Sequence, residues 1–279
     1  MVKNMKTIIL FILAFTIAAC TSQQSNDAVS TSLSETDLSG TWKYLRETKT
    51  YNISTNEYLY SDFLEYTMII SDSGGGVSYQ SCWRYGDSSI TAVKTDEYLY
   101  LDINSDGYSQ GSNGELSRTM LVDNPNSQTN ELRVTETLTK LSSNVQLDSG
   151  KFVLNGAITN IEDNHVCLFK SSNSLNSNES LEIVVPFYDS TLSVRLRSTE
   201  RLVPGTYQYE QSSNNIVYGF NVSSNSSIFW NQIGTNGLFP DRATISITES
   251  SVDIYSGTFS FVGIDNENYS GEFIIDPAY

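Results

Sequence analysis

The sequence predicts an all-β protein made of two successive antiparallel β domains. From Leu38 onward, short stretches of alternating apolar and polar residues recur, and turn-forming clusters separate them about every eight to twelve residues. No window of eleven or more residues in this region keeps the 3.6-residue apolar period of an amphipathic helix. The 279 residues, 39% of them apolar, allow one or two such domains and are too apolar for a disordered chain.

The first 19 residues have the layout of a cleaved secretory signal. Two lysines precede an uninterrupted apolar run, Thr7 to Ala19, which is too short to span a membrane. The sequence Ile-Ala-Ala-Cys at positions 17–20 resembles the lipobox of bacterial lipoproteins. This resemblance implies that Cys20 is lipidated, becomes the first residue of the mature chain and anchors it to a membrane of the cell envelope. An ordinary signal peptide that ends in Ala-Ala-Cys is the alternative.

The residue after Cys20 bears on the destination of the chain. Lipoproteins retained at the inner membrane usually carry Asp at this position, and here it is Thr21. The resemblance therefore implies the outer membrane of a Gram-negative cell. Residues 20–36 are polar and lack periodicity, so they are expected to form a flexible tether behind the lipid.

Residues 37–142 are expected to form the first β domain. The expected strands are 41–51, 58–71, 77–85, 90–94, 97–103, 115–122 and 131–141. The domain opens with Leu-Ser-Gly-Thr-Trp at positions 38–42, which resembles the G-x-W opening of lipocalin-like domains. The resemblance implies an antiparallel β-barrel whose base is closed by the packing of Trp42. A barrel of about eight strands has room for one small ligand.

Residues 143–279 are expected to form a second antiparallel domain, a β-sandwich or a barrel. The expected strands are 151–161, 165–171, 181–188, 191–198, 205–211, 215–223, 227–233, 242–249, 252–264 and 269–276. The pattern T-I-S-I-T at 244–248, G-T-F-S-F at 257–261 and G-E-F at 271–273 resembles an uncharacterised group of exported bacterial lipoprotein domains. That group has no known activity, so the resemblance implies a β fold and indicates nothing about function.

An aromatic row in the first domain is a candidate binding surface. Tyr98 and Tyr100 share one face of an expected strand, and Leu99 and Leu101 share the other. If the leucines face the core, the tyrosines form an exposed row that suits sugar or protein contact. If the tyrosines point inward, they line a ligand cavity. The general preference of tyrosine for strands explains the row without either role.

Arg195 and Arg197 are a second candidate for ligand or partner binding. They flank Leu196 on an expected strand and project together, as the basic cluster of an acidic chain. They are suited to holding an anion or a partner's carboxylate, although strand arginines often simply face solvent.

A partial calcium-loop pattern occurs at Asp102, Asn104 and Asp106. Alternate oxygen-bearing side chains followed by Gly107 match the first half of a D-x-N-x-D-G loop. The twelfth position is Asn113 instead of Glu, and an Asp-Gly turn between two strands explains the same residues without Ca²⁺.

The cysteines allow one disulfide. Once Cys20 is lipidated, Cys82 and Cys167 remain, and an exported location permits a bond between them. Two buried free thiols are the alternative.

The residue content argues against catalysis and against nucleic-acid binding. His165 is the only histidine, and no G-x-S-x-G nucleophile motif is present. The net charge is −16 at pH 7, so binding to nucleic acid by counterion release is not expected. We expect a non-enzymatic envelope protein whose barrel binds a small or amphipathic ligand. The alternative is an interaction or adhesion protein that recognises an envelope protein or glycan through exposed sheet faces.

Overall fold

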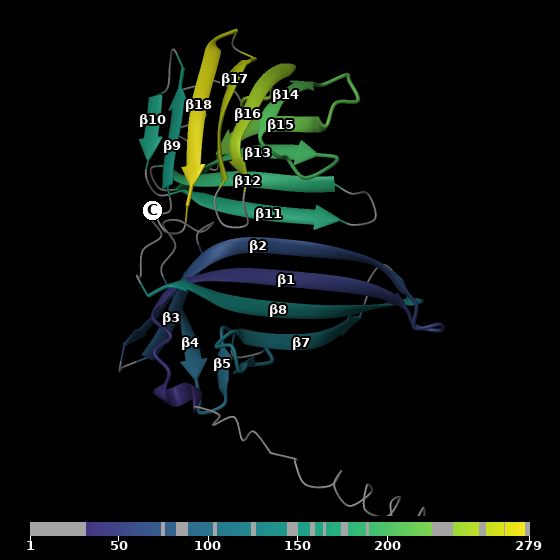
Figure 1. Ribbon diagram of the computed structural model, residues 1–279, viewed down its shortest axis with the longest axis vertical. Coiled ribbons are helices and arrows are strands. Elements are labelled where there is room, and N and C mark those ends of the chain that lie inside the picture. Colours follow the sequence, from purple (N-terminus) through teal and green to yellow (C-terminus); the bar gives the residue numbers. More distant parts are fainter. Residues whose placement is uncertain are drawn as a thin grey trace, which may run out of the picture. The chain divides into compact units, whose positions relative to one another are not determined.

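The computed structural model describes residues 32–73, 76–81, 89–102, 105–123, 127–143, 150–156, 160–163, 166–173, 178–187, 190–224, 237–250, 255–264 and 266–276. The protein is all-β, as the sequence predicts. Eight strands form a closed antiparallel barrel (Figure 1). They are β1 (Gly40–Asn52), β2 (Tyr58–Ser73), β3 (Gly76–Ser81), β4 (Ile90–Lys94), β5 (Tyr98–Tyr100), β6 (Tyr108–Gln110), β7 (Leu116–Asp123) and β8 (Asn130–Ser142).

The barrel closes because β1 pairs with β8 on one side and with β2 on the other. Around the barrel the order is β1-β8-β7-β6-β5-β4-β3-β2. Strands β1, β2 and β8 have 13, 16 and 13 residues, whereas β5 and β6 have 3 each. The long strands therefore run past the short ones and form a wall beyond the closed part of the barrel (Figure 1).

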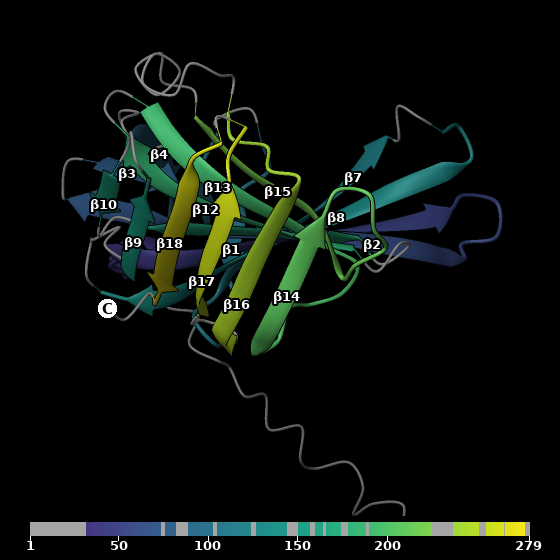
Figure 2. The ribbon, with the colours of Figure 1, turned by 90° about the horizontal axis from the view of Figure 1, so that it is seen from above.

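The remaining ten strands form two layers (Figure 2). They are β9 (Gly150–Asn155), β10 (Asn160–Asp163), β11 (Cys167–Asn173), β12 (Asn178–Phe187), β13 (Ser190–Ser198), β14 (Gly205–Glu210), β15 (Val217–Ser224), β16 (Arg242–Ser250), β17 (Tyr255–Val262) and β18 (Asn268–Ile275). One layer is β11-β12-β13-β15, and the other is a six-stranded sheet in the order β10-β9-β18-β17-β16-β14. Buried side chains of both layers belong to one apolar cluster, among them Val194 and Phe220 from the first and Phe259 and Phe273 from the second.

Strand β2 joins the barrel to the four-stranded layer. One edge of β2 pairs with β3 over residues 68–73 and with β11 over residues 62–65. As a result, β11-β12-β13-β15 continue the sheet of the barrel, and a single sheet of 12 strands results.

The base of the barrel is closed by the segment that precedes β1. This segment contains one 3₁₀ turn, η1 (Leu33–Glu35), and among the described residues no helix has the length and apolar character needed to cross a membrane. Leu33 and Leu38 are buried in the barrel core beside Trp42, whose indole Nε1 donates a 2.9 Å hydrogen bond to the carbonyl of Leu38. Residues 32–36, expected to lie in the tether, thus belong to the folded barrel.

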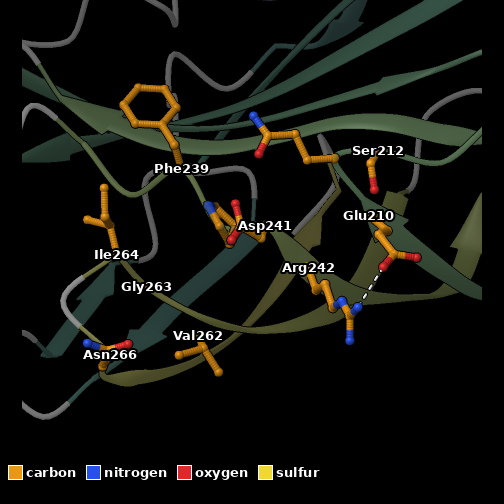
Figure 3. Close-up of a pocket in the computed structure, with 11 residues that line it drawn as sticks. Glu210, Ser212, Phe239, Asp241, Arg242, Val262, Gly263, Ile264 and Asn266 are labelled. Carbon is orange, nitrogen blue, oxygen red and sulfur yellow. Dashed lines mark ion pairs between the residues drawn. The ribbon is translucent and has the colours of Figure 1, made fainter.

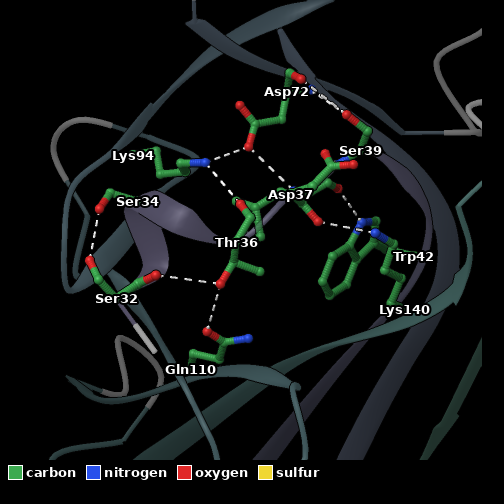
Figure 4. A network of polar contacts seen from close by, with 11 residues as sticks. Ser32, Ser34, Thr36, Asp37, Ser39, Trp42, Asp72, Lys94, Gln110 and Lys140 are labelled. Atoms are coloured by element: carbon green, nitrogen blue, oxygen red, sulfur yellow. Dashed lines mark hydrogen bonds and ion pairs between the residues drawn. The ribbon is translucent and has the colours of Figure 1, made fainter. Parts of the chain in front are cut away.

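Lys94 holds this closing segment in place (Figure 4). Its ammonium group donates to the carbonyl of Thr36 at 2.9 Å and to the carboxylate of Asp72 at 2.5 Å. The Asp72 carboxylate also accepts from the backbone N–H of Leu38 at 3.3 Å. One ion pair therefore links β4, β2 and the segment beneath the barrel.

The number of strands differs from the expected number in two places, at β6 and over residues 151–161. β6 was not predicted, because three residues give too few positions to show alternation. The single strand expected over 151–161 is two strands, β9 and β10, which pair with each other. The strand expected over 227–233 lies outside the described residues.

Candidate functional site

A buried carboxylate lies inside the barrel. Glu136 is on β8 between Val134 and Leu138, and all three alternate positions face inward. Glu136 is 4% exposed, whereas its two apolar neighbours are fully buried. An ionised side chain at such a position needs partners, because burial without them is strongly unfavourable.

Four side chains from three neighbouring strands surround this carboxylate. The Tyr108 hydroxyl donates a short hydrogen bond to Glu136 Oε2, and Arg118 Nε donates to the same oxygen at 2.7 Å. The Arg118 guanidinium also lies over the Tyr108 ring, 4.5 Å from its centroid. From β1, Tyr44 interacts with the carboxylate through its hydroxyl, and Arg46 Nε lies 4.0 Å from Oε1.

These contacts determine the protonation states of Glu136, Tyr44 and Tyr108 at neutral pH. Burial alone would raise the pKa of Glu136, but the hydrogen bonds from Tyr108 and Tyr44 and the charge of Arg118 outweigh it, so the pKa is lowered. Burial, together with the nearby carboxylate, raises the pKa of both tyrosines far above the ordinary value. Glu136 is therefore ionised and the two phenols are protonated near neutral pH.

On β1 and β2, three buried side-chain atoms have no hydrogen-bond partner among the residues that the structure describes. They are Arg46 Nε, Thr50 Oγ1 and Asp62 Oδ1. All belong to even-numbered positions of β1 and β2, the same alternation as the core residues Trp42 and Met68. We call the even-numbered positions 46–50 of β1 and 60–64 of β2 the inner wall. Burial raises the pKa of the Asp62 carboxyl, as expected for an acid that lacks a compensating partner.

The strand register extends the face of the inner wall into the four-stranded layer. Arg46 pairs with Leu64 on β2, Leu64 with Ser171 on β11, Ser171 with Ser180 on β12, and Ser180 with Arg197 on β13. Directly paired residues project from the same face of a sheet. Asp62 and Arg197 also line one cleft of about 360 Å³.

The predicted arginine pair is divided between two roles. The Arg195 guanidinium forms an ion pair with Glu182 on β12, with Nη2 2.6 Å from Oε2. Arg197 is exposed and has no hydrogen-bonding or ionic partner within the described part of the chain. Arg197 is thus the one of the two whose charge is available at the cleft.

The tyrosine row faces outward from the barrel. Leu99 is fully buried and Leu101 is 8% exposed, whereas Tyr98 is 38% exposed. The interpretation with inward-pointing tyrosines is therefore wrong, because closure of the barrel places the leucine face inside. The rings of Tyr98 and Tyr100 lie 6.1 Å apart. They are not brought together with Arg197, since β4, β3, β2, β11 and β12 lie between their strands.

The partial calcium loop gains no support as a site from the described residues. Asp102 and Asp106 are exposed, and Asn104 lies outside the described residues. Among the described residues, no three His, Cys, Asp or Glu side chains are grouped to hold a metal. The backbone carbonyl of Asp106 accepts a 2.6 Å hydrogen bond from Arg118, which fits a turn between strands.

The prediction that Cys82 and Cys167 form a disulfide bond can be compared with the structure at Cys167 alone. Cys167 is fully buried and disulfide-bonded, and it packs with Val184 and Tyr66. Cys82, its predicted partner, lies outside the described residues, as do Cys20 and His165. The pairing and the lipidation remain predictions.

Sequence reasoning missed Glu136, Arg46 and Asp62. A signal for Glu136 was present, because it occupies an inward position of an alternating strand between Val134 and Leu138. Nothing local distinguishes Arg46 or Asp62 from solvent-facing strand charges, so the burial of Arg46 Nε and Asp62 Oδ1 depends on the assembled sheet.

The chain matches no family model and no curated protein. A search of solved structures found the crystal structure of a Nitrosomonas europaea protein provisionally named AttH, with 9% sequence identity over 86% of this chain and 93% of that chain. The TM-score of this pair is 0.15, so the likeness supports no conclusion about fold or function.

Proposed function

We propose that the protein is a lipoprotein of the bacterial outer membrane, anchored through Cys20, that binds a small amphipathic ligand without catalysing a reaction. The lipobox at positions 17–20 and the lipocalin-like opening at 38–42 support this proposal. The ligand site would be the inner wall, above the closed base of the barrel.

The observation that carries the proposal is the set of unpartnered polar atoms on the inner wall. Arg46 Nε, Thr50 Oγ1 and Asp62 Oδ1 are buried, and each lacks a hydrogen bond to any part of the chain that the structure describes. Leaving a buried polar group unsatisfied costs about 1–3 kcal/mol. Three such atoms on adjacent strands are best explained by a ligand or water molecules that complete their hydrogen bonds.

The charges favour a ligand with an anionic group. Arg118 and Arg46 bring two positive charges to the one carboxylate of Glu136, which leaves this cluster with a net positive charge. Its side chain is 43% exposed, and Arg197 adds a second accessible cation on the same face. Leu64 and Tyr66 pack against the barrel core and would contact the apolar part of the ligand.

The test compares dodecanoate with dodecanol by isothermal titration calorimetry. The protein is the mature chain with Cys20→Ala, exported behind an ordinary signal peptide so that no detergent competes. We expect dodecanoate to bind at least tenfold more tightly than dodecanol, a difference of about 1.4 kcal/mol. Arg46→Met should remove this preference, because it removes the cation at the wall.

Arg133→Met is the matched control. Arg133 lies on β8 at an outward position, where its guanidinium covers the Tyr51 ring at 4.1 Å. Its loss should leave dodecanoate binding unchanged. Equal affinity for the acid and the alcohol, or no binding of either, would contradict the proposal.

A further inference from the structure

A hollow lies at one end of the six-stranded sheet (Figure 3), and none of its lining residues belongs to the inner wall. Three connections form it: the end of β14 with its following turn, the segment that leads into β16, and the turn between β17 and β18. Its volume is about 840 Å³, within the range of small-molecule sites. Pro240 and Gly263 are buried at its floor, and the other lining residues are more exposed.

Three large apolar side chains line this hollow although they are open to solvent. Phe239 is 54% exposed, Val262 is 51% exposed and Ile264 is 63% exposed. In Figure 3 they lie on one side of the opening. Single exposed apolar residues are ordinary, but a group of three around a concavity is typical of a binding site.

The lining of the hollow also has polar side chains that are free to bind. The side chains of Gln211, Asp241 and Asn266 make no hydrogen bond to any residue that the structure describes. Arg242 is occupied by an ion pair with Glu210, 2.8 Å between Nη2 and Oε1. Among the described lining residues, Asp241 is therefore the one charge that no ion pair balances, and it would repel an anionic ligand.

We propose that this hollow binds an uncharged N-acetylated hexosamine unit of a glycan. A pyranose ring has an apolar C–H face, which suits the Phe239 ring, and hydroxyl groups at its edge, which need the acceptors and donors of Asp241 and Gln211. The acetamide methyl group would pack against Val262 and Ile264. A purely apolar ligand would leave these polar side chains without partners, at a cost.

The experiment measures binding of chitotriose to the exported mature chain by isothermal titration calorimetry, with cellotriose as the sugar that lacks the acetamide groups. We expect chitotriose to bind at least tenfold more tightly than cellotriose. Phe239→Ala should weaken chitotriose binding at least tenfold, and Asp241→Asn at least fivefold. Val203→Ala should not change it, since Val203 is 55% exposed and lies outside the hollow.

Three results would overturn the proposal: no binding of chitotriose at millimolar concentration, equal affinity for both sugars, or chitotriose binding that survives Asp241→Asn unchanged. Asp241→Asn keeps the shape of the side chain, so it decides the matter if Phe239→Ala does not fold. Arg46→Met serves to separate the two sites. It should leave chitotriose binding intact, because Arg46 lies on β1 and not at this hollow.

Discussion

Glu136 makes the stability of the barrel depend on a buried charge. The Glu136 side chain is 5% exposed, and the Arg118 side chain that pairs with it is 12% exposed. A buried ion pair adds little net stability compared with apolar residues of the same volume, but removing one partner leaves the other charge buried alone. Replacing both Glu136 and Arg118 with apolar residues should therefore reduce stability less than replacing either residue alone.

Glu136→Gln should lower the free energy of unfolding by about 3–5 kcal/mol, because Arg118 then remains buried without a counter-charge. Urea denaturation followed by fluorescence measures the change. Glu131→Gln is the control on the same strand. Its side chain is 32% exposed, so its ion pair with Arg133 should contribute at most about 1 kcal/mol. Comparable losses in the two variants would contradict this account of the cluster.

The lowered pKa of Glu136 also predicts how stability changes in acid. Between the folded pKa and the ordinary value of 4.5, the unfolded chain holds more protons at this carboxyl than the folded protein. The contribution of Glu136 to stability is therefore complete above pH 4.5 and is lost as the pH falls through the folded pKa. Urea midpoints measured from pH 7 to pH 3 should fall less steeply for Glu136→Gln than for the parent. Parallel curves would show that other groups cause the acid sensitivity.

Individual residues were only partly predictable. Alternation placed Tyr98 and Leu99 on opposite faces, but it did not say which face was inside. The burial of Leu99 follows from closure of the barrel, which involves strands far away in the sequence. Arg197 was expected to be a binding residue, and whether it binds a ligand stays a prediction.

At the scale of elements, the segment with η1 acts as the base of the barrel. Leu33 is 2% exposed, and its backbone N–H donates a 2.9 Å hydrogen bond to the carbonyl of Asp96. The polar composition of residues 20–36 suggested a tether, because one leucine among serines and threonines does not indicate burial. The apolar core of the barrel supplies the contacts that bury Leu33, and these contacts come from residues distant in the sequence.

Leu33→Ala should destabilise the barrel by about 2–5 kcal/mol, the usual cost of emptying a well-packed leucine site. Thermal unfolding and limited proteolysis near residue 36 are the measurements, and both should show a loosened base. Val93→Ala is the control, because Val93 on β4 is 41% exposed. If Leu33→Ala behaved like the control, the segment would not be part of the folded barrel.

At the scale of the whole molecule, β2 is shared between the barrel and the four-stranded layer. It pairs with β1 and β3 in the barrel and with β11 in the other layer. Unfolding of either side would leave backbone groups of β2 without ladder partners.

We therefore expect residues 32–279 to unfold in one cooperative transition. Differential scanning calorimetry should give a calorimetric enthalpy equal to the van't Hoff enthalpy, the test for two-state behaviour. Two resolved transitions would show that the pairing of β2 with β11 does not couple the two halves.

The local pattern of the sequence was sufficient to predict an all-β chain, most strand positions and the two faces of each strand, because alternation is a property of neighbouring residues. The alternation within each strand does not predict which strands pair with one another. Closure of β1 on β2, the pairing of β2 with β11, and the burial of Glu136 and of the atoms Arg46 Nε and Asp62 Oδ1 all depend on residues distant in sequence. The free energy of those contacts belongs to the assembled sheet, so only the folded chain reveals the inner wall and the hollow.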